Sequence, residues 1–392
     1  MSVSVTVICE ASPQRALEVW REGLTADGVL VLMDPTWPTA MRREAGELVD
    51  RARAAGALAP RDLVVFTSGS SGRPRAVHRT RASWECSAAP CSEILGLRKD
   101  DVVGIPGPLR STLFAFGAWH GLFSGCEVVA ASVDELPTHP RGQAVSVVHT
   151  VPAMLPALCA LRVAGRLSGL RAVVVAGDAL SAELASLTTD LGLRVVEYYG
   201  AAELSFVGIR DAGGGGPMLP FPGVEVETRD GVLWSRSPYR MTSYLGPAGP
   251  MRLDAGGWAT VGDLAETWGG GFVVRGRGDA AVTTGGHTVV VEEIESFLRR
   301  LPGVADAGVV GLPHPRLGQR MVAVVQPASG SLDDAQLRAA CLELPAPARP
   351  RAFIQTRVPR AATGKIQRAP LRTLATEILA ARRDASAKER AS

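Results

Sequence analysis

The 392-residue chain lacks the features that mark several specialised classes of protein. Its six cysteines include no CxxC pair and most lie among apolar residues, which favours buried reduced thiols over a disulfide framework or a zinc site. No apolar run approaches the roughly 20 residues that a membrane-spanning helix needs, so no membrane span is expected. The first residues, "MSVSVTVICEA", have no basic flank and no convincing cleavage site, and we therefore expect a cytoplasmic protein without a signal peptide.

The chain also lacks a strong charge of either sign. Its net charge is +3, and acidic and basic residues are interspersed, so nucleic acid is not expected as a partner. One lopsided stretch, "ARRDASAKERAS", closes the chain, and we expect a frayed, solvated tail from about residue 383. Hydrophobic residues make up 46% of the sequence, which is ample for the packed cores of two or three domains.

Short β-branched runs alternate with helical patterns over the first half of the chain. "DLVVF", "DVVGIP", "VSVVHTV" and "RAVVVAG" are typical of buried strands, whereas "TLFAFGAWHGLF" and "SAELASLTTDLG" are typical of helices. This alternation predicts an α/β domain with largely parallel strands. From about residue 205 to 276 the pattern changes to period-two alternation around Asp230-Gly231, which predicts a β-hairpin within an antiparallel β subdomain.

A second unit follows. Residues 1–276 form the expected large unit, 277–279 a hinge, and 280–392 a small domain of ordinary size. The pattern of the small domain predicts an α+β fold. Helices are expected at "VEEIESFLRRL", at "DDAQLRAACL" and from Pro370, and strands at "ADAGVVGL" and "RMVAVVQP".

The loop "TSGSSGRPR" begins at Thr67, directly after a strand. Its hydroxyls and glycine N–H groups can surround a polyphosphate without steric cost, and Arg75 adds a cation just beyond. The spacing differs from that of a Walker loop, GxxxxGK[ST]. Taken alone, a Ser/Gly stretch is more typical of a plain flexible loop.

Six further segments follow or precede this loop in a fixed order. They are "VLMDPTWP", "LRAVVVAGDAL", "EYYGAAE", "WATVGDLAE", "GRGDAAVTTGGHTVVVEEIE" and "VPRAATGKIQR". Together these segments resemble the motifs of the adenylate-forming (ANL) superfamily, which includes acyl-CoA synthetases, peptide-synthetase adenylation domains and luciferases. The resemblance covers about residues 31–374, and the chain is similar to short bacterial acyl-CoA synthetases such as o-succinylbenzoate–CoA ligases. It implies a large α/β domain, shortened at its N-terminus, and a small mobile C-terminal domain.

The resemblance also implies a two-step reaction. A small-molecule carboxylate attacks the α-phosphorus of ATP, giving an acyl-adenylate and pyrophosphate, and the thiol of CoA then displaces AMP. Mg²⁺ is the implied metal ion. Neither step needs a covalent enzyme intermediate, so the protein has to supply charge neutralisation and positioning.

Individual roles follow from the matched motifs. Glu203 is expected to bind Mg²⁺, Tyr199 to stack on adenine, and Asp263 to accept hydrogen bonds from the ribose hydroxyls. The expected catalytic residues are Lys365, Glu203 and Arg75. The expected ATP-binding set comprises Thr67, Ser68, Gly69, Ser70, Ser71, Gly72, Gly177, Asp178, Ala179, Tyr198, Tyr199, Gly200, Ala202, Asp263 and Arg277.

Each of these residues has a plainer interpretation. Glu203 suits the start of a helix, Tyr199 suits a strand core, and Asp263 suits a turn after Gly262. Lys365 would be an ordinary surface lysine without its setting in "ATGKIQR".

Motion of the small domain is expected to serve the second step. Asp279 occupies the hinge position, where backbone torsions can change without disturbing packing. Gly285, Gly286 and His287 then line the expected CoA path, since glycines let a pantetheine chain pass close to the backbone. We expect the acyl pocket at Phe114, Phe116, Leu204 and Phe206, with Arg110 and His120 leaving room for a polar group.

Three residues depart from the family pattern. Arg75 replaces a lysine, and Ala202 and Val261 each replace a threonine, at a cost of about 1 kcal/mol each in nucleotide binding. Three functions therefore remain open: a CoA ligase, an adenylating enzyme that loads an acyl carrier protein or an amine, and a degenerate nucleotide or acyl binder. A monomer or a homodimer would suit any of them.

Overall fold

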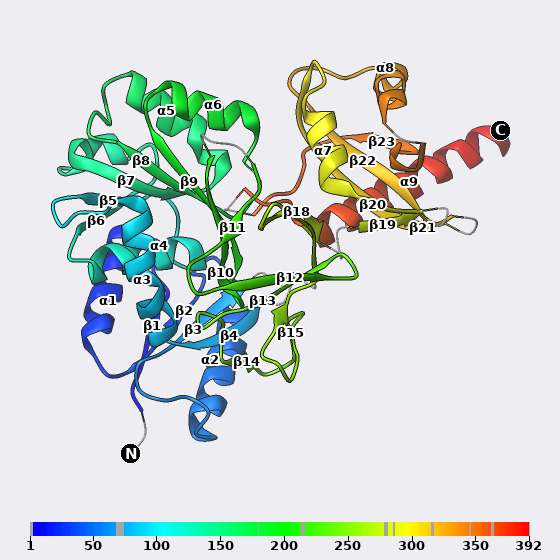
Figure 1. Ribbon diagram of the computed structural model, residues 1–392. Coiled ribbons are helices and arrows are strands. Elements are labelled where there is room, and N and C mark those ends of the chain that lie inside the picture. Colours follow the sequence, from blue (N-terminus) through cyan, green and yellow to red (C-terminus); the bar gives the residue numbers. More distant parts are fainter. Residues whose placement is uncertain are drawn as a thin grey trace.

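The computed structural model describes residues 3–67, 74–178, 180–212, 216–277, 281–284, 287–314, 317–344, 346–361 and 364–391. A large N-terminal domain and a smaller C-terminal domain lie side by side and meet along one side of each (Figure 1). This arrangement confirms the expected α/β domain with a separate small domain. Within the described residues, no helix is both long enough and apolar enough to cross a bilayer.

The first sheet of the large domain has the strand order β1-β2-β3-β4-β14. Its parallel strands are β1 (Val5–Ile8), β2 (Val29–Leu32) and β3 (Asp62–Thr67), connected through α1 (Pro13–Thr25) and α2 (Thr39–Ala54). β4 (Arg75–Thr80) runs antiparallel to β3, and β14 (Ser243–Leu245) returns from much later in the chain to pair with β4. All four residues of β2 are buried, as expected for a strand covered on both faces.

The second sheet has the order β11-β10-β9-β8-β7-β5-β6. Five strands are parallel: β5 (Val102–Ile105), β6 (Glu127–Ala130), β7 (Val145–Thr150), β8 (Ala172–Val175) and β9 (Arg194–Ala201). Two antiparallel strands, β10 (Ser205–Asp211) and β11 (Leu219–Pro220), complete it. Its helices are α3 (Ala82–Leu95), α4 (Thr112–Phe123), α5 (Leu155–Val163) and α6 (Ala182–Asp190), with a 3₁₀ turn η3 (Pro152–Met154) before α5.

Helix α4 is apolar on nearly every side because it is buried in the core of the large domain. Phe114, Trp119 and the residues between them are buried. Two glycines permit this packing: a Cβ at Gly117 would lie 2.7 Å from the His149 ring, and one at Gly121 would lie 2.7 Å from Val128. The sequence prediction of this helix is therefore confirmed, and its composition reflects burial on all sides.

The third sheet is antiparallel and has six strands: β12 (Glu225–Arg229), β13 (Val232–Arg236), β15 (Arg252–Leu253), β16 (Ala259–Thr260), β17 (Asp263–Trp268) and β18 (Gly271–Arg277). The predicted hairpin joins β12 to β13. Asp230 and Gly231 both have positive φ, 51° and 73°, as a two-residue type I′ turn requires. The sheet begins at Glu225 rather than near residue 205, because β10 and β11 extend the second sheet instead.

The small domain is built on a further sheet of five strands: β19 (Ala281–Thr284), β20 (His287–Val290), β21 (Val304–His314), β22 (Gly318–Pro327) and β23 (Ala352–Gln355). Its helices are α7 (Val291–Arg299), α8 (Asp334–Ala340) and α9 (Arg368–Ala391). The backbone of α9 is helical through Ala391, and the frayed tail expected from about residue 383 stays a prediction. Four of the six cysteines are buried, as expected, whereas Cys9 is half-buried and Cys86 is exposed.

Candidate active site

The parallel strands of the second sheet bring two expected site segments, those after β8 and at the end of β9, to one edge, beside the segment after β7. The carboxyl ends of β7, β8 and β9 lie at this edge, so the segments after them are neighbours. Gly177, after β8, has φ +91°, and a Cβ there would lie 3.5 Å from Val151 and 3.7 Å from Leu113. The turn at Gly177-Asp178 therefore lies between the end of β7 and the first turn of α4, in the position expected for a ligand-contacting turn.

Glu203 lies in the tight hairpin between β9 and β10. It is buried, with 5% of its surface exposed, and the Tyr244 hydroxyl donates a hydrogen bond of 2.9 Å to its carboxylate. The backbone N–H of Met241 donates to the Glu203 carbonyl at 2.7 Å. Burial, and then the negative charge of Glu203, raise the pKa of Tyr244 above its ordinary value, so this tyrosine remains a donor. These contacts hold the carboxylate in one orientation.

Tyr244 links Glu203 to the Ser/Gly loop. It lies on β14 opposite Val77 of β4, and β4 begins at Arg75 directly opposite Thr67, the last residue of β3. The positive charge of Arg75 lies close enough to lower the pKa of Tyr244, although burial and the charge of Glu203 raise it by more. Five predicted residues of the loop fall outside the described residues: Ser68, Gly69, Ser70, Ser71 and Gly72. The two ends of the loop and Glu203 are nonetheless on the same side of the domain.

A second pair of predicted residues is also brought together. The Tyr199 hydroxyl donates a hydrogen bond to the Asp263 carboxylate, and Asp263 is 7% exposed at the start of β17. Asp263 is the register partner of Arg277 across β17 and β18. The expected nucleotide-contacting residues of β9 and of the third sheet therefore meet, although the Arg277 side chain and Ala179 lie outside the described residues.

Successive residues of β9 point to opposite faces. Tyr199 points toward Asp263, so Tyr198 points into the domain, where its ring lies 4.6 Å from Phe206 and burial raises its pKa. Gly200 is required by the hairpin, since a Cβ there would come within 2.0 Å of the Ser205 carbonyl oxygen. Tyr198 is therefore a core residue in this structure, and its expected contact with ATP stays a prediction.

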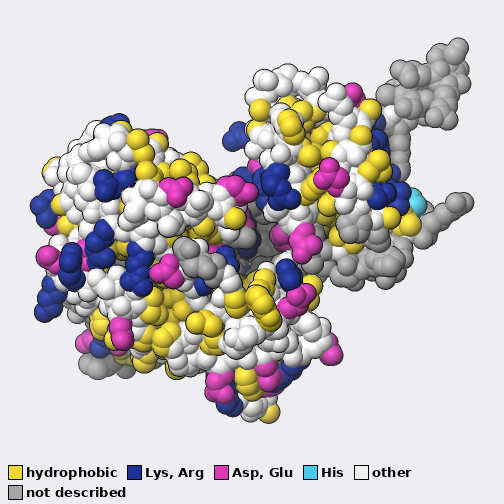
Figure 2. Space-filling model, turned by 45° about the horizontal axis from the view of Figure 1, so that its top comes forward, with side chains coloured by type: hydrophobic (Ala, Val, Ile, Leu, Met, Phe, Trp, Pro, Cys, Tyr) yellow, Lys and Arg dark blue, Asp and Glu magenta, His cyan; other side chains and the backbone are white. Residues whose placement is uncertain are grey.

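Lys365 approaches this edge from the small domain. It follows Gly364, which has φ +79° and lies so close to Ala153 of η3 that a Cβ would come within 2.9 Å of the Ala153 Cβ. Lys365 itself is exposed. Figure 2 shows the surface hollowed between the two domains, with basic and acidic side chains along both walls. The loop that carries Lys365 thus lies against the large domain, next to the segment that follows β7.

A model of the AMP-binding enzyme family matches residues 2–245, and a model of the AMP-binding enzyme C-terminal domain matches residues 293–365. The chain belongs to the AMP-binding enzyme family.

Relatives within this family include several acyl-CoA ligases. The uncharacterized acyl-CoA ligase YhfT of Bacillus subtilis is 30% identical over 331 residues, which are 77% of this chain and 66% of that protein. A salicylyl-CoA synthase/salicylate adenylyltransferase of a Streptomyces species is 30% identical over 67% of this chain and 53% of its own. A probable 2-succinylbenzoate–CoA ligase of Mycobacterium tuberculosis is 29% identical over 79% of this chain and 83% of its own. This AMP-binding enzyme thus spans only about half to two thirds of several relatives.

Solved structures show the same fold. ATP-bound MatB from Rhodopseudomonas palustris has a TM-score of 0.80 at 21% identity, over 96% of this chain and 90% of that one. The Bacillus subtilis o-succinylbenzoate CoA synthetase MenE, in complex with the acyl-adenylate OSB-AMP, has a TM-score of 0.79 at 21% identity, over 94% and 88%. The fold of this AMP-binding enzyme is therefore established, including its separate small domain.

The expected acyl-pocket residues lie in the core of the large domain. Phe114, Phe116, Leu204 and Phe206 are all buried, and the rings of Phe116 and Phe206 are 4.8 Å apart. Phe116 stacks on His120, and its ring lies 6.4 Å from that of His149. Among the described residues, neither nitrogen of His149 has a hydrogen-bond partner. That these residues line a substrate pocket stays a prediction.

The hinge and the expected CoA path are less fully described in this AMP-binding enzyme. Asp279, Gly285 and Gly286 lie outside the described residues, and His287 begins β20 without a described side chain. Their roles stay predictions.

Of the three residues that depart from the family pattern, Val261 is 6% exposed, and its neighbour Thr260 accepts a hydrogen bond from the Gly262 N–H at 3.0 Å. A threonine hydroxyl is thus still present in this turn, one residue earlier in the chain.

Several residues of the site were missed from sequence. Tyr244 had no local signal, because its role depends on the long-range pairing of β14 with β4. Arg79 is fully buried, donates to the Tyr239 carbonyl at 3.1 Å, and has its pKa lowered by burial to about 10 while the charge of Glu203 opposes that shift. Arg110 was expected beside the acyl pocket, but its ion pair of 2.8 Å with Asp34 was not, because only the fold brings the two near. Arg79 stands in the polar stretch "HRTR", which gives no local signal that this arginine is buried.

Proposed function

We propose that this protein is an AMP-forming acyl-CoA ligase that activates a small-molecule carboxylate with ATP and transfers the acyl group to CoA. The observation that carries the proposal is the meeting of the Lys365 loop with the large domain, seen in the close approach of Gly364 to Ala153. Glu203, Asp263 and the ends of the Ser/Gly loop belong to the same large domain. Membership of the AMP-binding enzyme family supports this assignment of roles.

The first step needs negative charge to be neutralised at the α-phosphate and the attacking carboxylate. The ammonium of Lys365 is a compact cation on a flexible stem, suited to contact both oxygens as the new bond forms. Arg75 and the loop that starts at Thr67 hold the β- and γ-phosphates while pyrophosphate leaves. The Asp263 carboxylate accepts hydrogen bonds from the ribose hydroxyls, and Tyr199 orients this carboxylate through its own hydrogen bond to it.

A magnesium ion fits the chemistry of Glu203. Mg²⁺ in nucleotide sites is usually held by one or two carboxylates together with phosphate oxygens and water. Glu203 is a buried carboxylate held in one orientation by Tyr244, and in the described part of the chain there is no cluster of three or more metal-binding side chains. Glu203 would hold Mg²⁺, which would supply charge neutralisation at the phosphates.

The second step needs an acceptor thiol at the face of the adenylate that Lys365 occupies in the first. We propose that the small domain turns about residue 279 and brings the segment at 285–287 to the adenylate. CoA is the proposed acceptor. An acyl carrier protein or an amine is the alternative, and the protein would act as a monomer or a homodimer.

Incubation with ATP, Mg²⁺, CoA and a panel of carboxylates tests the proposal. We expect an acyl-CoA thioester by mass spectrometry, together with AMP and pyrophosphate. Formation of adenylate without thioester would mean that the acyl acceptor is a carrier protein or an amine and not CoA. Nucleotide binding without adenylate from any acid would identify a degenerate binder, in line with the changes at Arg75, Ala202 and Val261.

A further inference from the structure

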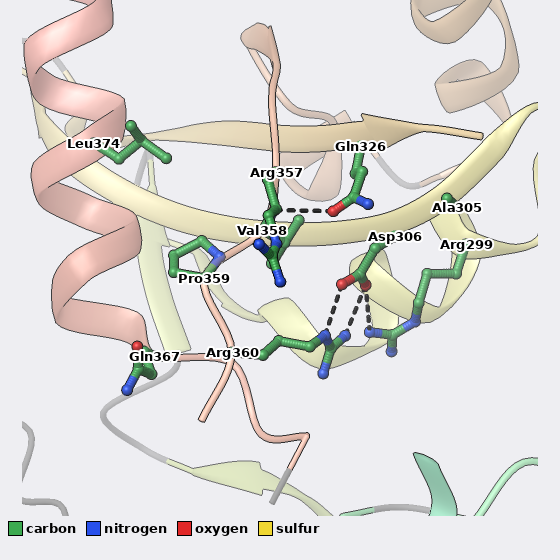
Figure 3. A pocket seen from close by; sticks show the side chains of 10 residues that line it. All are labelled: Arg299, Ala305, Asp306, Gln326, Arg357, Val358, Pro359, Arg360, Gln367 and Leu374. Carbon is green, nitrogen blue, oxygen red and sulfur yellow. Dashed lines mark hydrogen bonds and ion pairs between the residues drawn. The ribbon is translucent and has the colours of Figure 1, made fainter. Parts of the chain in front are cut away.

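One guanidinium ties the Lys365 loop to the body of the small domain. Arg360 donates two hydrogen bonds to Asp306, from Nε at 2.6 Å and from Nη2 at 2.7 Å (Figure 3). Asp306 lies near the start of β21, where the pairing with β22 shifts register. A two-pronged bond of this kind fixes the orientation of the guanidinium as well as its distance. Arg360 is therefore anchored to the sheet of the small domain.

The same guanidinium reaches the residue before Lys365. Its Nη1 donates to the Gly364 carbonyl, so one side chain joins Asp306 to the backbone next to the lysine. The turn is closed by two further bonds: the Ala361 N–H donates to the Lys365 carbonyl at 2.8 Å, and the Gly364 N–H donates to the Ala361 carbonyl at 2.9 Å. Residues 360–361 and 364–366 are thereby held together as the two arms of a hairpin whose position depends on Arg360.

The large domain also acts on Arg360. The pKa of Arg360 is raised, first by its hydrogen bond to Asp306, and in smaller part by the charges of Asp178 and Glu295. Asp178 belongs to the turn after β8, so a negative charge of the large domain acts on Arg360 near the point where Gly364 meets Ala153.

We propose that Arg360 and Asp306 are positioning residues for Lys365. They hold the hairpin in a fixed shape, so that the lysine reaches the nucleotide when the small domain occupies the position seen here. Ordering the loop before the substrate binds removes an entropy cost from the reaction. The inference rests on the proposed function, and it concerns the adenylating step alone, because Lys365 has no expected part in the transfer to CoA.

Two half-reactions separate this role from a general structural one. We would measure carboxylate-dependent ATP–pyrophosphate exchange, and thioester formation from a chemically prepared acyl-adenylate and CoA, in Arg360→Met, Arg360→Lys and Asp306→Asn. A displacement of about 1 Å can cost about 100-fold in rate, so we expect Arg360→Met to lower kcat for exchange by about 30-fold or more. The KM for ATP and the transfer step should change less than about threefold, and Arg360→Lys should recover part of the loss.

Arg357→Met is the matched control. Arg357 lines the same hollow of about 820 Å³ in the small domain, so its loss changes the charge of the hollow without removing an anchor of the hairpin (Figure 3). We expect both half-reactions to match the wild type. Amide hydrogen exchange gives a readout that needs no substrate. The Ala361 and Gly364 amides should exchange faster than in the wild type in Arg360→Met, and at the wild-type rate in Arg357→Met.

The outcomes are distinguishable. A wild-type protein that exchanges no pyrophosphate with any acid would refute the proposed function, while amide exchange would still test the anchoring of the hairpin. Unchanged exchange kinetics in Arg360→Met would overturn the inference. Equal losses in both half-reactions, together with a lowered Tm, would also overturn the inference. They would indicate a general structural role, and Arg360→Lys and Asp306→Asn would then show the same uniform loss.

Discussion

Gly364 of the small domain lies against Ala153 of the large domain, with room for no side chain between them: a Cβ at position 364 would come within 2.9 Å of the Ala153 Cβ. The contact joins the hairpin that carries Lys365 to the 3₁₀ turn after β7. Because the positive φ of Gly364 also disfavours any side chain, this glycine is required twice over, by its own backbone and by its neighbour.

Gly364→Ala should therefore impair adenylation more than stability. We expect a loss of about 10- to 100-fold in pyrophosphate exchange, because the added methyl pushes the hairpin away from the large domain. Gly330→Ala is the matched control, since Gly330 also has a positive φ of 60° in the small domain but no atom within 4 Å of its added Cβ. Both variants should lose similar stability by thermal unfolding. Equal exchange rates in the two variants would show that the contact with Ala153 is unimportant.

Tyr244→Phe should weaken the binding of magnesium. The change removes the hydroxyl that donates to Glu203 and leaves a buried carboxylate without this donor. We expect about 1–3 kcal/mol of lost stability and a higher Mg²⁺ concentration at half-maximal exchange. Tyr239→Phe removes a comparable bond of 2.7 Å, to the Pro222 carbonyl, and should lower stability without altering the Mg²⁺ titration. A shared shift in both titrations would contradict the role given to Glu203.

Asp263→Asn should raise the KM for ATP. The amide accepts with one oxygen only, so it cannot bond to both ribose hydroxyls and to Tyr199 as a carboxylate can. We expect an increase of about 10-fold or more, and a smaller increase for Tyr199→Phe, which leaves the carboxylate in place. The two substitutions should be non-additive, because one hydrogen bond joins these residues. Full additivity in the double variant would mean that Tyr199 does not act through Asp263.

Acid should destabilise the large domain through two buried histidines. Burial lowers the pKa of His120 to about 4 and that of His149 to about 3. An unfolded chain binds a proton at each near pH 6.5, whereas the native protein does not until these lower values. The free energy of unfolding should therefore fall as the pH drops from about 6.5 to about 4, by up to about 2.7 kcal/mol per pH unit for the two residues together.

Denaturant unfolding between pH 7 and 4.5 checks this expectation. His149→Gln should roughly halve the part of the slope that comes from the pair, since one of the two protons taken up on unfolding is lost. His139→Gln, which removes a histidine outside this cluster, serves as the control. An unchanged slope in His149→Gln would mean that His149 is already charged, or solvated, in the native protein.

Local pattern predicted most of the elements of the large domain correctly. Local sequence alone predicts the helix at Thr112–Phe123, from its apolar run, and the hairpin turn at Asp230-Gly231, from its turn residues. The boundary near residue 205 was wrong because period-two alternation indicates a strand but not the strand with which it pairs. β10 pairs with β9 rather than with the third sheet, and no local feature distinguishes the two outcomes.

Long-range contacts explain what the sequence could not show at the site. Ordered motifs predict Glu203, Asp263 and Lys365, and also Tyr199 beside Asp263, whereas other residues that contact the site come from distant segments without a motif. Tyr244 reaches Glu203 only because β14 crosses back to β4, and Asp306 reaches Arg360 only because the start of β21 lies beside the segment that carries Arg360. Such partners have no fixed spacing from the residue that they hold.

Carboxylate-dependent ATP–pyrophosphate exchange in the wild type and in Lys365→Ala is the most direct measurement of whether the two domains cooperate in forming an adenylate. We expect exchange with at least one acid in the wild type, a loss of 100-fold or more, on the order of 3 kcal/mol, in Lys365→Ala, and unchanged thioester formation when that variant is given acyl-adenylate and CoA. Exchange that survives in Lys365→Ala, or that fails in the wild type while nucleotide still binds, would contradict the role of the small domain described above.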